Sequence, residues 1–120
     1  MRAKLRYLHS TDIDDLENWT PGPDFGVSIQ ILVGPIDAEG EESFQVTVCS
    51  PRWFAEQMSE TEIRSGHHVI FMLEYNYRRL LAFIEHAIHR TEAATWSELG
   101  AKLSWLGQWE FEEYRAQLES

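Results

Sequence analysis

The sequence predicts an α+β fold: an antiparallel sheet of about four strands with helices packed on one face, in the order β-β-β-α-β-α-α-α. Two patterns predict it. Apolar and polar residues alternate through much of the first half of the chain, which is typical of half-buried strands. From residue 76 onward, apolar residues recur at every third or fourth position, which is typical of amphipathic helices. Strands that come first and helices that come last favour an antiparallel sheet covered by helices.

The first strand is predicted over residues 3–9. Its alternation places Ala3, Leu5 and Tyr7 on one side and the basic Lys4 and Arg6 on the other. The stretch that follows, residues 10–24, contains prolines and five acidic residues, and we expect a loop there.

Two further strands are predicted to form a hairpin. Residues 25–33 and 44–48 both alternate, and the turn-forming sequence of residues 34–42 joins them. The apolar side chains would face the core. The opposite sheet face would carry Lys4, Arg6, Ser28, Gln30, Gln45 and Thr47, so it is expected to be solvated or available to a partner.

A short helix and a fourth strand are expected next. Ser50 followed by Pro51 is typical of a helix start, and Trp53, Phe54 and Met58 would form its buried stripe. After a polar connection, the continuous apolar run of residues 69–73 predicts a strand that is covered on both faces or lies at the sheet centre.

Three helical segments complete the predicted fold. Leu80, Phe83, Ile84, Ala87 and Ile88 have helical spacing. Residues 95–98 fit a capping box for a second helix. A last helical segment is expected from residue 110 to residue 118.

Composition limits the classes of function. The 120 residues are 43% hydrophobic, which is enough for one core, so we expect a single domain over residues 1–120. The formal net charge of −10 disfavours binding to nucleic acid or to an anionic membrane and favours a basic protein partner. The sequence shows no signal peptide or membrane span, so a cytoplasmic location is expected.

The acidic residues fall into three clusters, which could form one negative surface. The first contains Asp12, Asp14, Asp15 and Glu17; the second contains Asp37, Glu39, Glu41 and Glu42; the third contains Glu110, Glu112 and Glu113. Trp19 follows the first cluster and is the best candidate for an exposed or half-exposed aromatic anchor. Interfaces commonly combine such an anchor with charged residues that speed association. The first two clusters and Trp19 are the predicted partner-binding residues.

The sequence gives little support for a catalytic or cofactor-binding site. The glycines are scattered rather than clustered as in a phosphate-binding loop. The acidic loop lacks several ligands of a calcium loop. Cys49 lies at the end of an apolar strand, where a buried, inert thiol is expected. We therefore predict no metal, no cofactor and no enzymatic activity.

The chain resembles the immunity protein 8 family of bacterial polymorphic toxin systems. The residues that carry the resemblance are Trp19-Thr-Pro21 with the Phe25 strand, the junction Val48-Cys49-Ser50-Pro51-Arg52-Trp53, Gly66-His67-His68, Trp96, and the most specific block, Trp109-Glu110-Phe111-Glu112-Glu113-Tyr114. The resemblance implies a non-enzymatic protein that binds a cognate toxin domain and blocks it. Within that block, Trp109, Glu110, Phe111 and Tyr114 are the family-motif residues.

Two other interpretations remain open from sequence. The chain could be a regulatory or scaffold subunit that acts through the open sheet face, as a homodimer. It could also be a small metal-dependent hydrolase that uses His67 or His68 with Glu74. Both a monomer and a homodimer are compatible with the sequence.

Overall fold

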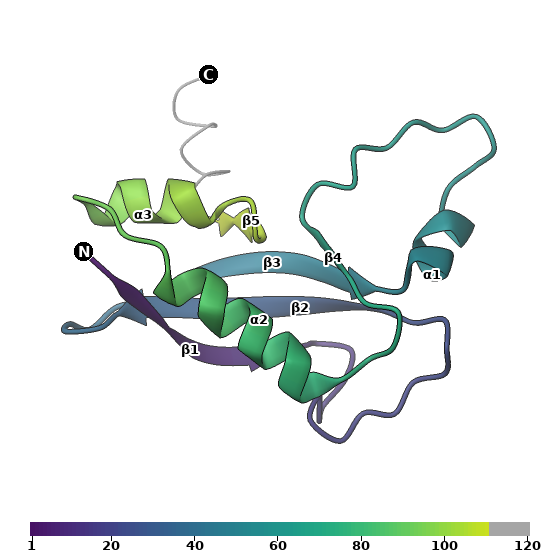
Figure 1. The fold of residues 1–120 in the computed structure, drawn as a ribbon, viewed down its shortest axis with the longest axis horizontal. Coiled ribbons are helices and arrows are strands. Elements are labelled where there is room, and N and C mark those ends of the chain that lie inside the picture. Colours follow the sequence, from purple (N-terminus) through teal and green to yellow (C-terminus); the bar gives the residue numbers. More distant parts are fainter. Residues whose placement is uncertain (111–120) are drawn as a thin grey trace.

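The computed structural model describes residues 1–110 and confirms the predicted α+β class (Figure 1). The helix expected over residues 110–118 falls, apart from its first residue, outside the described part of the chain. The elements in chain order are β1 (Ala3–His9), β2 (Gly26–Pro35), β3 (Glu42–Cys49), α1 (Pro51–Glu56), β4 (Val69–Phe71), α2 (Tyr77–His89), α3 (Trp96–Leu103) and β5 (Gln108–Trp109).

The predicted hairpin is the centre of the sheet. β2 and β3 pair antiparallel without interruption from Gly26↔Cys49 to Val33↔Glu42. The apolar positions of the two predicted strands, residues 25–33 and 44–48, face the core as expected. The buried residues are Phe25, Val27, Ile29, Ile31, Val33, Phe44, Val46 and Val48. β1 pairs antiparallel with the other edge of β2.

The predicted inward position of Tyr7 is wrong. The β1–β2 register shifts between Leu5 and Tyr7, so that Arg6 is an extra residue in β1. Such a bulge reverses which residues face the core. Leu8 is therefore buried and Tyr7 is 58% exposed.

The fourth strand also differs from its prediction. β4 has three residues and lies at an edge of the sheet, paired parallel with β3 from Thr47↔Val69 to Cys49↔Phe71. β5 was not predicted at all. It pairs antiparallel with the first half of β3, through Phe44↔Trp109 and Gln45↔Gln108, so β4 and β5 share one edge of that strand.

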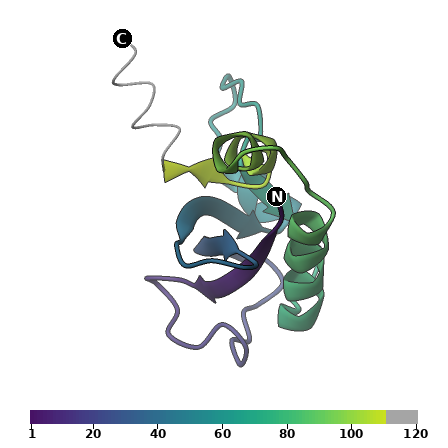
Figure 2. The ribbon, with the colours of Figure 1, turned by 90° about the vertical axis from the view of Figure 1, so that its left-hand side faces the viewer.

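The two longer helices lie on one face of this sheet (Figure 2). The Asn76 side chain accepts a hydrogen bond from Arg79 N (3.0 Å), which caps α2. Thr95 Oγ1 likewise accepts one from Glu98 N (3.1 Å) and confirms the predicted cap of α3. The predicted inner stripe of α2 is buried except for Phe83, which is 48% exposed.

The short helix α1 begins as predicted, but its apolar stripe is only half-buried. The hydroxyl of Ser50 accepts a hydrogen bond from Trp53 N (3.2 Å) and Pro51 is the first helical residue. Trp53, Phe54 and Met58 are each partly exposed. A Cβ added to Gly26 would lie 2.2 Å from the Trp53 ring. Because Gly26 alternates with the core residues of β2, Trp53 covers the end of the opposite sheet face.

That opposite face is polar, as expected. Lys4, Arg6 and Gln45 are exposed, while Ser28, Gln30 and Thr47 are half-buried. Gln45 Nε2 donates a hydrogen bond to Ser28 Oγ (3.0 Å) across neighbouring strands.

Candidate partner-binding surfaces

The acidic loop of residues 10–24 is anchored on the core by a small aromatic cluster. Trp19 packs edge-on against Tyr75, with ring centroids 4.8 Å apart, and against Phe25 at 6.1 Å. The Tyr75 hydroxyl donates a hydrogen bond to the carbonyl of Leu16, whose side chain is buried. These contacts join the loop to the segment before α2, so the loop has a defined position.

The four predicted acids of this loop are all exposed. The carboxylates of Asp12, Asp14, Asp15 and Glu17 are therefore in contact with solvent. Asp15 accepts hydrogen bonds from the side chain and backbone of Asn18, which hold the pKa of its carboxyl below the usual value. Burial raises the pKa of Tyr77, and the negative charges of Glu17 and Glu85 raise it further. The acids of the loop thus act electrostatically on the first turn of α2.

Trp19 itself is half-buried and separates two hollows. One has a volume of about 540 Å³ and is lined by Trp19, Thr20, Pro21, Gly22, Pro23, Leu73, Glu74 and Tyr75. The other, of about 340 Å³, is lined by Glu17, Asn18, Trp19, Tyr75, Asn76, Tyr77 and Arg78. Trp19, predicted to be an exposed or half-exposed anchor, is thus half-buried and lines both hollows.

The second acidic cluster lies at the other end of the sheet (Figure 1). Asp37, Glu39 and Glu41 are exposed in the β2–β3 turn, which Arg6 Nη2 fixes by donating to the carbonyls of Pro35 (2.7 Å) and Ala38 (2.8 Å). β2 separates this turn from the loop of residues 10–24, and a strand of its 10 residues spans about 30 Å. The first two clusters therefore do not merge into one surface.

Glu42 has a different environment from the rest of its cluster. Its Oε1 accepts a hydrogen bond from Trp96 Nε1 (3.1 Å) and its Oε2 accepts one from Trp109 Nε1 (3.2 Å). Both carboxylate oxygens are thus used to connect the sheet with α3 and β5. Trp109 is 2% exposed and stacks on Phe44, with ring centroids 6.1 Å apart.

The model of one protein family, immunity protein 8, matches residues 3–114 of this sequence. The match covers nearly the whole chain, including every described element. The chain belongs to the immunity protein 8 family. In the same comparisons, no curated protein and no solved structure matched it.

Membership identifies the chain as a toxin-neutralising immunity protein, and proteins of this family are typically non-enzymatic inhibitors. The motif residue Trp109 is a core residue of this immunity protein rather than a surface contact. Glu110 is exposed and lines a polar hollow with Gln30, Ser43, Gln45 and Gln108. Phe111 and Tyr114 of the motif, and Glu112 and Glu113 of the third acidic cluster, lie outside the described residues.

The residues considered for metal or thiol chemistry are not assembled into a site in residues 1–110. That part of the immunity protein holds no group of three or more His, Cys, Asp or Glu side chains placed to bind a metal ion. The rings of His67 and His68 lie close together but are tilted by 41°, with centroids 3.6 Å apart, and His68 has a positive φ of 59°. Burial raises the pKa of the Cys49 thiol, which favours its protonated form. No helix within the same residues is long and apolar enough to cross a membrane.

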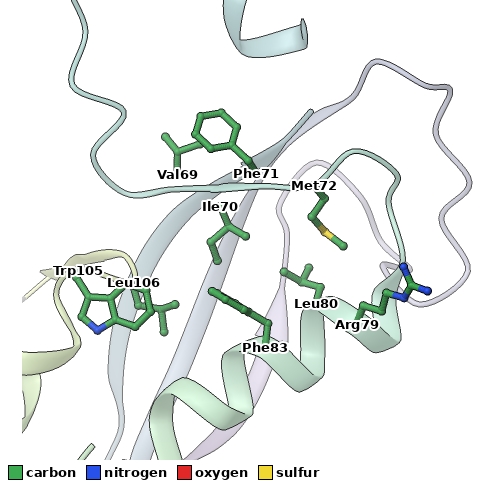
Figure 3. Close-up of a pocket in the computed structure, with 9 residues that line it drawn as sticks. All are labelled: Val69, Ile70, Phe71, Met72, Arg79, Leu80, Phe83, Trp105 and Leu106. Carbon is green, nitrogen blue, oxygen red and sulfur yellow. The ribbon is translucent and has the colours of Figure 1, made fainter. Parts of the chain in front are cut away.

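One further surface was missed by sequence reasoning. A cleft of about 310 Å³ lies between β4, α2 and the turn after α3 (Figure 3). The apolar run of residues 69–73 is the sequence feature that marks this surface, but its pattern predicts a strand that is covered on both faces or lies at the sheet centre. Its edge position instead leaves Phe71 48% and Leu73 84% exposed.

Proposed function

We propose that this immunity protein neutralises its toxin by stoichiometric occlusion, with the acidic loop of residues 10–24 facing a basic surface of the toxin domain. The observation that carries the proposal is the exposure of Asp12, Asp14, Asp15 and Glu17 together on a loop fixed by the Trp19–Tyr75 contact. Ordered carboxylates lose little conformational entropy on binding and speed the encounter with a basic partner.

A nuclease-like toxin fits this charge pattern best. Its substrate groove must be basic in order to bind phosphates, so a row of carboxylates can occupy the groove in place of the nucleic acid backbone. The chain's net charge of −10 would also raise the association rate with such a toxin. The resulting inhibition needs no chemistry from the immunity protein.

The acids of the β2–β3 turn are a second candidate contact. A standard interface covers about 800 Å² on each partner, which corresponds to a patch about 30 Å across. The loop and the turn are separated by a similar distance, so one toxin groove of standard size would be centred on only one of them. We place the centre at the loop, because it combines carboxylates with an aromatic anchor.

The test is co-expression with a candidate toxin domain, chosen as the C-terminal domain of a large multidomain protein whose gene lies immediately upstream of this one. Rescue of growth, together with a stable one-to-one complex, would support the proposal. Binding should weaken steeply between low and physiological ionic strength, since exposed charges are screened by salt. An affinity that does not change with salt would contradict the acidic mechanism, and failure to rescue growth from that active toxin would contradict the pairing.

A further inference from the structure

The cleft between β4 and α2 is an open apolar surface with a defined shape. Ile70 of β4 and Met72, which follows that strand, project toward α2, where Leu80 and Phe83 face them, and Trp105 with Leu106 closes one end (Figure 3). Leu80 and Leu106 are each 1% exposed and form its floor. Phe83 and Trp105 meet edge to face, with ring centroids 6.4 Å apart.

Large apolar side chains are unusually exposed around this cleft. Phe83 is 48% exposed and Trp105 47%, and the adjoining Leu73 is 84% exposed. Phe71 points away from α2 (Figure 3) and packs edge-on against Phe54 instead. Single exposed apolar residues are ordinary, but several around one hollow mark a binding surface. Half-exposed aromatic residues beside a preformed hollow are also the usual centre of a protein interface.

The rim of the cleft is basic, in contrast to the acidic loop. Arg79 lines its open end, and the guanidinium of Arg90 lies 5.7 Å from the centre of the Trp105 ring. Within residues 1–110, neither arginine forms an ion pair. Arg79 near the start of α2 and Arg90, the C-cap of that helix, therefore place a cation on either side of Phe83. This arrangement suits a segment that carries a carboxylate beside an apolar side chain.

The strand β4 adds a backbone edge to this surface. Among residues 1–110 its only pairing partner is β3, and the parallel register turns the N–H and C=O groups of Val69 and Phe71 away from β3. An exposed strand edge can pair with an extended segment of a partner.

The cleft lies close to the loop surface, because residues adjacent in the chain line the two. Met72 lines the cleft, while Leu73 and Tyr75 line the hollow beside Trp19. Arg79 lines the cleft and Arg78 lines the neighbouring hollow at Glu17. One interface of standard size, about 30 Å across, can therefore include both the acidic loop and the cleft.

We infer that the cleft between β4 and α2 is the apolar docking site for the toxin domain. Its occupant is a segment that inserts an aromatic or leucine side chain against Phe83 and Trp105 and directs a carboxylate to Arg79. This inference rests on the proposed function and deepens it. A second copy of the chain is disfavoured as the occupant, because two partners of net charge −10 repel each other.

The experiment measures affinity for the same upstream C-terminal domain by calorimetry. Phe83→Ala should weaken binding by about tenfold or more, as expected of an aromatic hot spot. The matched control is Tyr7→Ala, which removes an aromatic ring of similar exposure (58%) from the opposite sheet face and should change affinity less than twofold. Arg79→Glu should also weaken binding about tenfold, whereas Lys4→Glu on the opposite face should have a much smaller effect.

The outcomes separate this inference from the proposed function. If the wild-type chain binds and Phe83→Ala binds equally well, the cleft is not the docking site, although the immunity function stands. If the wild-type chain does not bind the active toxin domain, both proposals fall. Native mass spectrometry of the chain alone gives the remaining outcome: a dimer that Phe83→Ala dissociates would assign the cleft to self-association and overturn the inference. Unchanged thermal unfolding of each variant shows that folding is intact.

Discussion

The indole Nε1 of Trp109 donates a hydrogen bond to Oε2 of Glu42, 67 residues earlier in the chain. Trp96 donates to the other oxygen of the same carboxylate. One side chain at the start of β3 therefore holds α3 and β5 in place. Glu42 therefore has a structural role, whereas its neighbour Glu41 is exposed.

Replacing Glu42 with Gln should destabilise the fold. The amide offers one acceptor where the carboxylate offers two, so one indole N–H loses its partner at a cost of about 1–3 kcal/mol. Chemical unfolding measures this loss as a lower denaturant midpoint. Glu41→Gln, one residue away and exposed, is the matched control and should stay within about 0.5 kcal/mol of the wild type. Equal stability of the two variants would show that the indole contacts contribute nothing.

Gly100 is required by the close approach of α3 to Trp109. A Cβ at this position would lie 2.4 Å from Cζ2 of the Trp109 ring. Gly100→Ala should therefore destabilise the protein by about 1–3 kcal/mol, even though alanine favours a helix. Gly22→Ala serves as the control, because nothing lies within 4 Å of its added Cβ. Thermal unfolding that is unchanged in Gly100→Ala would contradict the packing described for Trp109.

Tyr75 should make stability sensitive to alkaline pH. Burial raises its pKa to about 12, with smaller contributions from Tyr77 and Asp15, against an ordinary value of 10.0. Because the folded-state pKa lies above the unfolded one, its contribution is complete below about pH 10 and decreases as the pH rises toward 12. The wild type should therefore lose more stability than Tyr75→Phe between pH 9 and pH 11, as measured by urea unfolding. Parallel losses in both proteins would assign the effect to other groups.

Reversing the charge of the acidic loop should affect association and not folding. Asp14→Lys with Glu17→Lys removes negative charge from exposed positions, so the association rate with the upstream toxin domain should fall at least about tenfold. Stopped-flow mixing at low salt measures the rate, and thermal unfolding should be unchanged. The matched variant Asp37→Lys with Glu39→Lys reverses the same charge on the β2–β3 turn. A larger effect there would move the interface to that end of the sheet.

Much of the fold could be predicted from the sequence, because the local pattern of apolar residues indicates whether a segment is a strand or a helix. Alternation located β1, β2 and β3, and the Asn76 and Thr95 regions marked the starts of α2 and α3. What local patterns could not indicate is pairing between distant segments. The edge position of β4 and the existence of β5 depend on which segment reaches β3, and three or two residues are too few to carry a period.

The candidate site was predictable only in part, for a similar reason. The exposure of Asp14 and Glu17 follows from a polar loop, but their separation from the β2–β3 turn depends on the direction of β2. The sequence does not distinguish Glu42 from the exposed acidic residues, because the two indoles that donate hydrogen bonds to it are 54 and 67 residues away in the chain. The extra residue in β1, Arg6, turns the side chain of Tyr7 away from the core. A bulge of this kind cannot be predicted from the amino-acid composition of the strand.

The position of Trp109 in the chain has a consequence for how the protein is made. Synthesis proceeds from the N-terminus at about 5–20 residues per second, and the local β1–β2–β3 pairings can form while the rest is still being added. The ring that stacks on Phe44, and the N–H that reaches Glu42, arrive only when residue 109 has been added. A nascent chain therefore lacks this part of its core until residue 109 has been synthesised. A toxin partner that requires the completed core can therefore bind only after β5 has paired with β3.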